Sequence, residues 1–188
     1  MKRLFSLVLL VLFPLLATGN ARAEPVVTAK SITVLGSPLV LKDEKKAADQ
    51  YLAEYIPEGE TFDNFTKMFA VWGRLDGTDA AFQAKAKIQF VTARKSSDPL
   101  ANFNAFQSDD KKMFGVDFLI SEGAVMEHNV WTFQNVKGGV LAYQYARRHY
   151  DGKSTQSAES FIKEIPTIRD QTLTFLKTAP LPKPQGYN

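Results

Sequence analysis

The sequence contains no cysteine among its 188 residues. It therefore has no disulfide framework, no thiol chemistry and no thiolate metal site, and it cannot carry the cysteine-linked lipid of a bacterial lipoprotein. Its two histidines, His128 and His149, lack the H-x-x-x-H spacing of a helical metal pair. No G-x-S-x-G elbow and no phosphate-binding glycine loop is present. We therefore expect no metal and no cofactor.

The first residues have the pattern of a secretory signal peptide. Lys2 and Arg3 precede an apolar run over residues 4–16, and residues 21–23 have the A-x-A form of a cleavage site. The apolar run is shorter than the roughly 20 residues that a membrane span needs. We expect residues 1–23 to be a signal peptide cleaved after Ala23, which makes the mature protein periplasmic or secreted, with no membrane span and no lipid anchor.

The formal net charge of +3 belongs to the signal peptide. Three basic residues, Lys2, Arg3 and Arg22, leave with it, so the mature chain is formally neutral. A neutral chain has no net electrostatic attraction to nucleic acid or to an anionic membrane. Neither partner is expected.

The remaining chain is long enough for one domain with a large core, supplied by 14 Phe, 6 Tyr and 2 Trp. We expect this domain to cover residues 24–178. Pro180, Pro182 and Pro184 then predict an extended, proline-rich tail over residues 179–188.

Alternating apolar residues and turn signals predict a strand-rich domain. Strands are expected over residues 32–34, 39–41, 51–56, 67–72, 114–120, 127–136 and 140–150. Residues 42–49 are expected to form a charged surface connection, with at most one helical turn. The turn at residues 137–139 joins the last two strands as a hairpin.

Two longer segments have helical spacing. Residues 81–91 follow a capping turn and repeat alanine, isoleucine and valine at helical positions, although alternation over residues 84–90 leaves a strand as the alternative. A helix over residues 158–177 begins at Ser157 as its cap and is kinked at Pro166. Asp98-Pro99 predicts a short helix that carries Phe103 and Phe106.

Several strands have apolar residues on both faces, which indicates a sheet covered on two sides. The expected fold is α+β, with one mostly antiparallel sheet between helices on both faces. This element order resembles the α/β/α sandwich of the PsbP-like superfamily, which includes an extrinsic photosystem subunit and many exported bacterial proteins. The resemblance implies an accessory or partner-binding role, and it carries over no functional residue because no diagnostic motif is shared.

An acidic turn follows the strand at residues 51–56. It contributes Glu54, Glu58 and Glu60, with Asp63 and Asn64 close by, and such oxygen ligands suit calcium. Their spacing does not match an EF-hand loop. The simpler interpretation is a turn and a cap that return Phe62 and Phe65 to the core.

The hairpin end over residues 127–150 carries the second candidate site. A two-residue turn at Lys137-Gly138 places Glu127 opposite Arg148 and His128 opposite Arg147, with His149 next in the strand. A general acid/base or anion site could be built from these groups. The alternatives are an ordinary cross-strand ion pair at a strand end, and a register shifted by one residue that pairs Glu127 with Tyr150.

Three functional classes follow from these observations. The first is a non-catalytic exported protein that binds another envelope protein, such as an immunity or inhibitor protein. The second is a small hydrolase or lyase using His128, Arg147 and His149. The third is a carrier of an apolar ligand, which requires a cavity between sheet and helix lined by phenylalanines.

Overall fold

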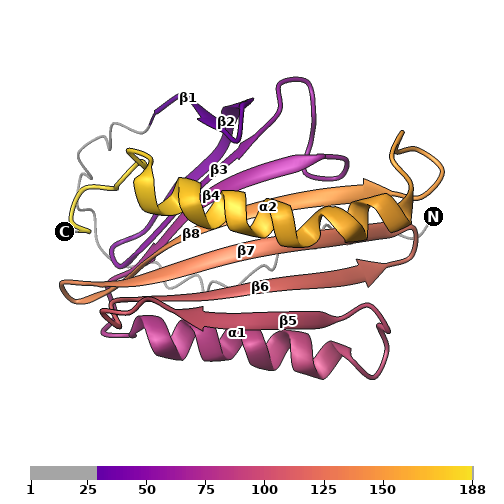
Figure 1. The fold of residues 1–188 in the computed structure, drawn as a ribbon. Helices are drawn as coiled ribbons and strands as arrows, with labels where there is room; N and C mark the ends of the chain where they lie inside the picture. Colours follow the sequence, from indigo (N-terminus) through magenta and orange to yellow (C-terminus); the bar gives the residue numbers. More distant parts are fainter. Residues whose placement is uncertain (1–28, 188) are drawn as a thin grey trace.

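A computed structural model describes residues 29–187, and the expected signal peptide lies outside them. These residues form one eight-stranded antiparallel sheet in the order β1-β2-β3-β4-β8-β7-β6-β5, with two helices (Figure 1). The strands are β1 (Ser31–Val34), β2 (Ser37–Lys46), β3 (Gln50–Ile56), β4 (Lys67–Arg74), β5 (Asn102–Gln107), β6 (Met113–Glu122), β7 (Val125–Val136) and β8 (Gly139–Tyr150). The helices are α1 (Ala80–Arg94) and α2 (Ala158–Thr178).

The two helices lie against opposite faces of the sheet. Ile168, Phe175 and Leu176 of α2 pack on one face with Phe69 and Tyr143, and we call this the α2 face. The other face, the α1 face, carries a separate cluster formed by α1 with β4, β6, β7 and β8. Figure 1 shows α2 crossing in front of β7 and β8, while α1 lies at the β5 side of the sheet.

The expected α/β/α sandwich is wrong. About 23% of the described residues are helical, and the chain is mostly sheet rather than a sheet enclosed by helical layers. α1 packs mainly on β5, β6 and β7, so a helix of 15 residues covers only part of its face. Two-sided apolar strands correctly indicated material on both faces, but they do not say how much of that material is helix.

Two local expectations are also corrected. Residues 42–46 continue β2 beyond an irregularity at Leu41/Asp43, so they are strand and not a connection. Residues 102–107 are β5, an edge strand paired with β6, and not a helix. The carboxylate of Asp98 accepts hydrogen bonds from Leu100 N at 3.0 Å and from Ser121 N at 2.6 Å, which ties this segment to β6 before a helix can begin.

Other expectations are confirmed. The segment around residues 81–91 is helix α1, capped by Asp79, whose side chain accepts from Phe82 N. Ser157 caps α2, and this helix contains Pro166. The β7–β8 hairpin has the expected register, with Val136 opposite Gly139.

The segment after α2 returns to the sheet. Tyr187 is 4% exposed and belongs to the cluster on the α2 face. Its ring occupies the space where a side chain at Gly73 would stand, and Pro182 O accepts a hydrogen bond from Tyr143 Oη at 3.2 Å. Within residues 29–187, neither helix has the length and hydropathy required to cross a membrane.

Candidate ligand-binding site

A cavity of about 620 Å³ lies between α1 and the α1 face of the sheet. Its volume falls within the range of about 300–1,000 Å³ that is typical of small-molecule sites. Its lining is mostly apolar and includes seven aromatic side chains: Phe65, Trp72, Phe82, Phe90, Phe118, Trp131 and Phe133. Phe82, at 62% exposed, is the largest apolar side chain left open to solvent in this lining.

The side chains of β8 differ in size between the two faces of the sheet. Leu141, Tyr143 and Tyr145 point to the α2 face and fill it. The alternate residues Ala142 and Ala146 belong to the clusters on the opposite side. Since neighbouring residues of a strand point to opposite faces, β8 presents large side chains to α2 and small ones to α1. The two alanines are packed in those clusters, and Gln144, which lies between them on the same face, lines the cavity.

A chain of hydrogen bonds crosses the floor of the cavity between β7 and β8. Gln144 Nε2 donates to Asn129 Oδ1 at 2.6 Å, and Asn129 Nδ2 donates to Glu127 Oε1 at 2.8 Å. Arg148 Nε donates to Glu127 Oε2 at 2.5 Å, and Arg148 Nη1 donates to Phe62 O at 3.1 Å. All four of these strand side chains are buried. The chain holds a few polar groups in fixed positions on an otherwise apolar floor, as small-molecule sites commonly do.

Glu54, on β3, is the second carboxyl group in the cavity lining. Burial and the neighbouring charge of Asp43 raise its pKa to about 7, against a smaller opposing effect of Lys45. A carboxyl group that is partly protonated at neutral pH donates or accepts a hydrogen bond according to its partner. Perturbed groups of this kind cluster at functional sites.

Lys87 projects from α1 into the same cavity. Its Nζ lies 3.9 Å from the centroid of the Trp131 ring, and the Trp131 ring stacks on Phe133 with an interplanar angle of 8°. Burial lowers the pKa of Lys87 to about 8, against the opposing charge of Glu127. The indole Nε1 of Trp131 is buried and has no hydrogen-bond acceptor among residues 29–187.

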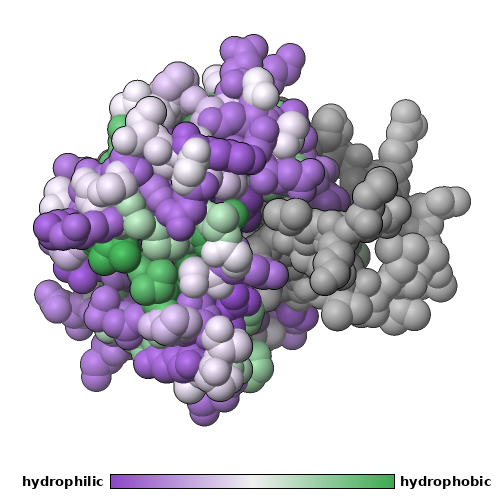
Figure 2. Space-filling model, turned by 90° about the vertical axis from the view of Figure 1, so that its right-hand side faces the viewer, coloured by the Kyte–Doolittle hydropathy of each residue, from purple (hydrophilic) through white to green (hydrophobic). Residues whose placement is uncertain are grey.

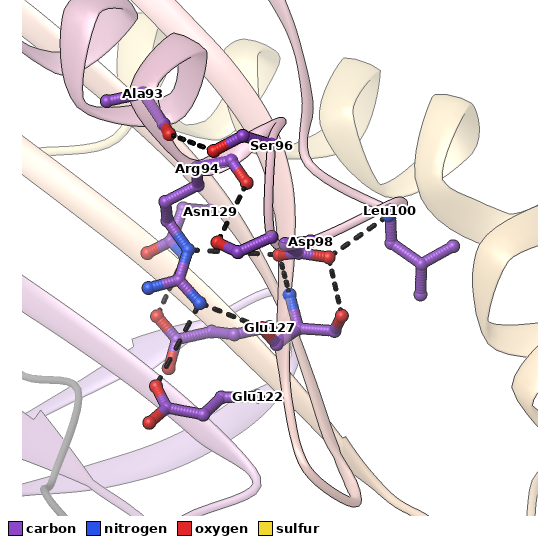
Figure 3. A network of polar contacts seen from close by, with 10 residues as sticks. Ala93, Arg94, Ser96, Asp98, Leu100, Glu122, Glu127 and Asn129 are labelled. Atoms are coloured by element: carbon purple, nitrogen blue, oxygen red, sulfur yellow. Dashed lines mark hydrogen bonds and ion pairs between the residues drawn. The ribbon is translucent and has the colours of Figure 1, made fainter.

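A polar network at the C-terminal end of α1 fixes the helix over the sheet (Figure 3). Ser121 donates to the Asp98 carboxylate from both N and Oγ at 2.6 Å. Arg94 Nη2 donates to Ser121 O at 2.8 Å. At the other end, Ala80 N donates to Asn135 Oδ1 at 2.7 Å. Both ends of α1 are thus tied to β6 or β7, which sets the width of the cavity.

A second hollow, of about 1,100 Å³, lies at the end of the sheet where β6, β7 and β8 meet the loop before β4. It shares Ile120, Glu127 and Arg148 with the first cavity, so the two hollows adjoin. Figure 2 views this end of the molecule and shows apolar side chains exposed among hydrophilic ones. Arg147 and His149, two of the residues predicted from sequence, also line it.

The predicted hairpin cluster is divided between the two faces of the sheet. The expected pairings of Glu127 with Arg148 and of His128 with Arg147 are confirmed, which excludes the shifted register. The first pair faces the α1 cavity. His128 and Arg147 face the other way, where His128 Nε2 lies 2.5 Å from Asp117 Oδ1. His128 lines neither hollow.

The other two predicted hairpin residues on the α2 face, Arg147 and His149, also have structural partners. Arg147 Nη2 donates to Glu164 Oε2 of α2 at 3.2 Å. His149 Nε2 lies 3.4 Å from Asp151 Oδ1, and its ring centroid lies 5.6 Å from that of Phe161. These contacts fasten the start of α2 to the hairpin. Arg147 and His149 line the second hollow together with Glu127 and Arg148, but each of the four already has a structural partner.

The acidic turn also separates. Glu54 belongs to the cavity, whereas Glu60 accepts hydrogen bonds from Thr66 N at 2.6 Å and Thr66 Oγ1 at 2.8 Å. Glu58 lies on the exposed turn. Across residues 29–187, no group of three acidic or histidine side chains could hold a metal ion. The turn therefore serves mainly to close the loop and to bring Phe65 into the core.

Sequence reasoning missed Lys87, Asn129 and Gln144 as site residues. Lys87 had a signal, because it occupies the same helical stripe as Ala80, Ala84 and Val91, which are the buried residues of α1. A lysine in an apolar stripe indicates either a cavity or a buried partner.

The fold and cavity define a single-sheet domain with one filled face and one partly open face. A family model matches residues 27–181, most of the chain, and the chain belongs to that family, which is uncharacterised. A comparison with curated proteins finds no match. None of these comparisons confirms the resemblance to the PsbP-like superfamily.

Proposed function

We propose that this is an exported, non-catalytic binding protein that holds a small, largely apolar molecule between α1 and the sheet. The observation that carries the proposal is the cavity of about 620 Å³, with its aromatic lining and its fixed polar floor. Apolar pockets with a few placed polar groups are the usual form of small-molecule sites. The expected class of binding protein is kept, but the proposed ligand is a small molecule and not an envelope protein.

A hydrolase or lyase at the hairpin end has less support. Such an enzyme needs its acid and base within reach of one substrate position. Glu127 and His128 lie on opposite faces of the sheet, and Asp117, Glu164 and Asp151 already engage the three cationic or imidazole groups of the α2 face.

The test is a fluorescence titration of the mature protein, residues 24–188, with the neutral probe N-phenyl-1-naphthylamine. The comparison variant is Ala86→Trp, because Ala86 lines the cavity from α1. The control is Ala81→Trp, because Ala81 is exposed on the same helix and lies outside the lining. Both variants should keep the circular dichroism spectrum of the parent.

We expect saturable binding by the parent and by Ala81→Trp, and binding at least about tenfold weaker by Ala86→Trp, a loss of roughly 1.4 kcal/mol. Absence of saturable binding by the parent would contradict the proposal. Equal binding by both variants would show that the probe sits elsewhere, and it would also refute the proposal.

A further inference from the structure

Among residues 29–187, cationic side chains outnumber acidic ones in the cavity lining. The cationic residues are Lys45, Lys46, Arg74, Lys87 and Arg148, and the acidic residues are Glu54 and Glu127. Three of these five cations, Lys45, Arg74 and Arg148, have a carboxylate partner. Lys46 is exposed, and the remaining cation lies in the interior of the cavity without such a partner among residues 29–187. The identity of that cation decides what the cavity attracts.

Arg148 is neutralised by Glu127 at 2.5 Å, and Lys45 is paired with Asp43, Nζ to Oδ2, at 2.6 Å. Arg74 is paired with Asp76 in the same way. The charge of each of these cations is therefore largely offset by a carboxylate that is already in place.

Lys87 is different. No carboxylate oxygen of residues 29–187 lies within ion-pair distance of its Nζ, whose described contact is the face of Trp131. The nearby carboxylate of Glu127 already accepts from Arg148 and from Asn129. A half-buried ammonium without a close anion carries a desolvation cost that an anionic partner would offset.

Two further observations agree with an anionic partner. The buried Nε1 of Trp131 is a donor without an acceptor in the described part of the chain, so the wall beside Lys87 offers a second donor. Glu54 does not cancel the positive potential fully, because burial raises its pKa to about 7 and leaves a share of the carboxyl group neutral at that pH.

We propose that the ligand is an anionic amphiphile, an apolar or aromatic body that carries one carboxylate or sulfonate group, and that Lys87 pairs with this group while the aromatic lining holds the body. This inference rests on the proposed function, since it assigns the chemical class of the molecule in the same cavity. It makes Lys87 the residue that selects an anionic ligand over a neutral one.

The experiment uses two probes that differ in a single group. 1-Anilinonaphthalene-8-sulfonate carries a sulfonate, and N-phenyl-1-naphthylamine has the same aromatic framework without it. Both are titrated at pH 7 into the mature parent and into Lys87→Met, which keeps the length of the side chain and removes its charge. Lys85→Met is the matched control, because Lys85 is exposed on the same helix and does not line the cavity.

We expect Lys87→Met to weaken the binding of the sulfonate probe about tenfold or more, because a charge-assisted contact contributes roughly 1.5–3 kcal/mol to the binding free energy. The neutral probe should change less than about twofold, and Lys85→Met should leave both probes unchanged. Decanoate should displace the sulfonate probe from the parent at lower concentration than decanol does.

The two proposals fail in different ways. If neither probe binds the parent saturably, there is no ligand site and both proposals fall. If both probes bind and Lys87→Met weakens them equally or not at all, the cavity is a ligand site but the anionic class is wrong. Near-ultraviolet circular dichroism of each variant checks that the sulfonate probe is not reporting a loosened core.

Discussion

The buried pair of Glu127 and Arg148 gives the most direct test of how the cavity floor is held. The perturbation is a double-mutant cycle composed of Glu127→Gln, Arg148→Met and the double variant. The two side chains are 8% and 5% exposed, and Arg148 Nε lies 2.5 Å from Glu127 Oε2. Neither Phe62 O, which accepts from Arg148, nor Asn129, which donates to Glu127, can replace the missing charge.

The structure sets the magnitude. Removing Arg148 leaves a buried carboxylate without its cation, which costs about 3–5 kcal/mol of unfolding free energy. The double variant leaves no isolated charge, so it should be less destabilised than the sum of the two single variants. The coupling free energy should reach about 2 kcal/mol, within the range for residues in one network. The assay is urea denaturation at constant pH, and the slopes should agree among the variants.

The control is Glu159 with Lys163, an i,i+4 pair on α2 with an Oε1 to Nζ distance of 2.7 Å. Its side chains are 77% and 72% exposed, so its coupling should be only about 0.3–0.5 kcal/mol. A coupling below about 1 kcal/mol for the buried pair, or one equal to that of the control, would refute the reasoning that burial makes this pair strong.

Three further predictions concern other parts of the fold. Glu54→Gln should stabilise the protein at pH 8 by up to ~3 kcal/mol and change it little at pH 4. The reason is that burial raises the pKa of Glu54 from 4.5 to about 7. The parent therefore loses stability as the pH rises from 4.5 to about 7, and urea denaturation at a series of pH values would show this loss. Asp98→Ala should lower the melting temperature and reduce the free energy of unfolding by roughly 2–3 kcal/mol, because Ser121 N and Oγ lose the carboxylate that accepts their hydrogen bonds. An unchanged melting temperature would contradict this. Tyr187→Ala should lower the free energy of unfolding, measured by urea denaturation, by about 3 kcal/mol. Gly73→Ala should lower it by a similar amount, because the new Cβ would displace the Tyr187 ring. The double variant should therefore lose less stability than the sum of the two single variants.

The parts of the fold that sequence reasoning captured depend on local chemistry. The turn at Lys137-Gly138 fixes the β7–β8 register, because Gly138 adopts a φ of 84° that suits glycine. Ser157 and Asp79 cap the two helices as expected. Each of these features is decided by residues within a few positions of one another.

The parts that could not be predicted depend on distant partners. Asp98-Pro99 has a helix-start pattern, yet the Asp98 carboxylate is engaged by Ser121, 23 positions further along the chain. The register of the hairpin predicts that Glu127 and Arg148 are partners, but their burial depends on residues elsewhere in the chain. A strand end is normally solvated, and this one is covered by Phe65, whose ring centroid lies 3.7 Å from Arg148 Cζ.

The residue pattern of β8 distinguishes the two faces of the sheet. In β8, residues 141, 143 and 145 are leucine and tyrosines, whereas residues 142, 144 and 146 are alanine, glutamine and alanine. All six are buried. A buried strand face of small and amide side chains leaves room for side chains from neighbouring elements, and α1 places Lys87 beside Phe82 and Phe90 in the lining of the cavity. The α2 face is a packed core, whereas the α1 face contains the cavity. Under the proposed function, the ammonium group of Lys87 would favour an anionic ligand in that cavity.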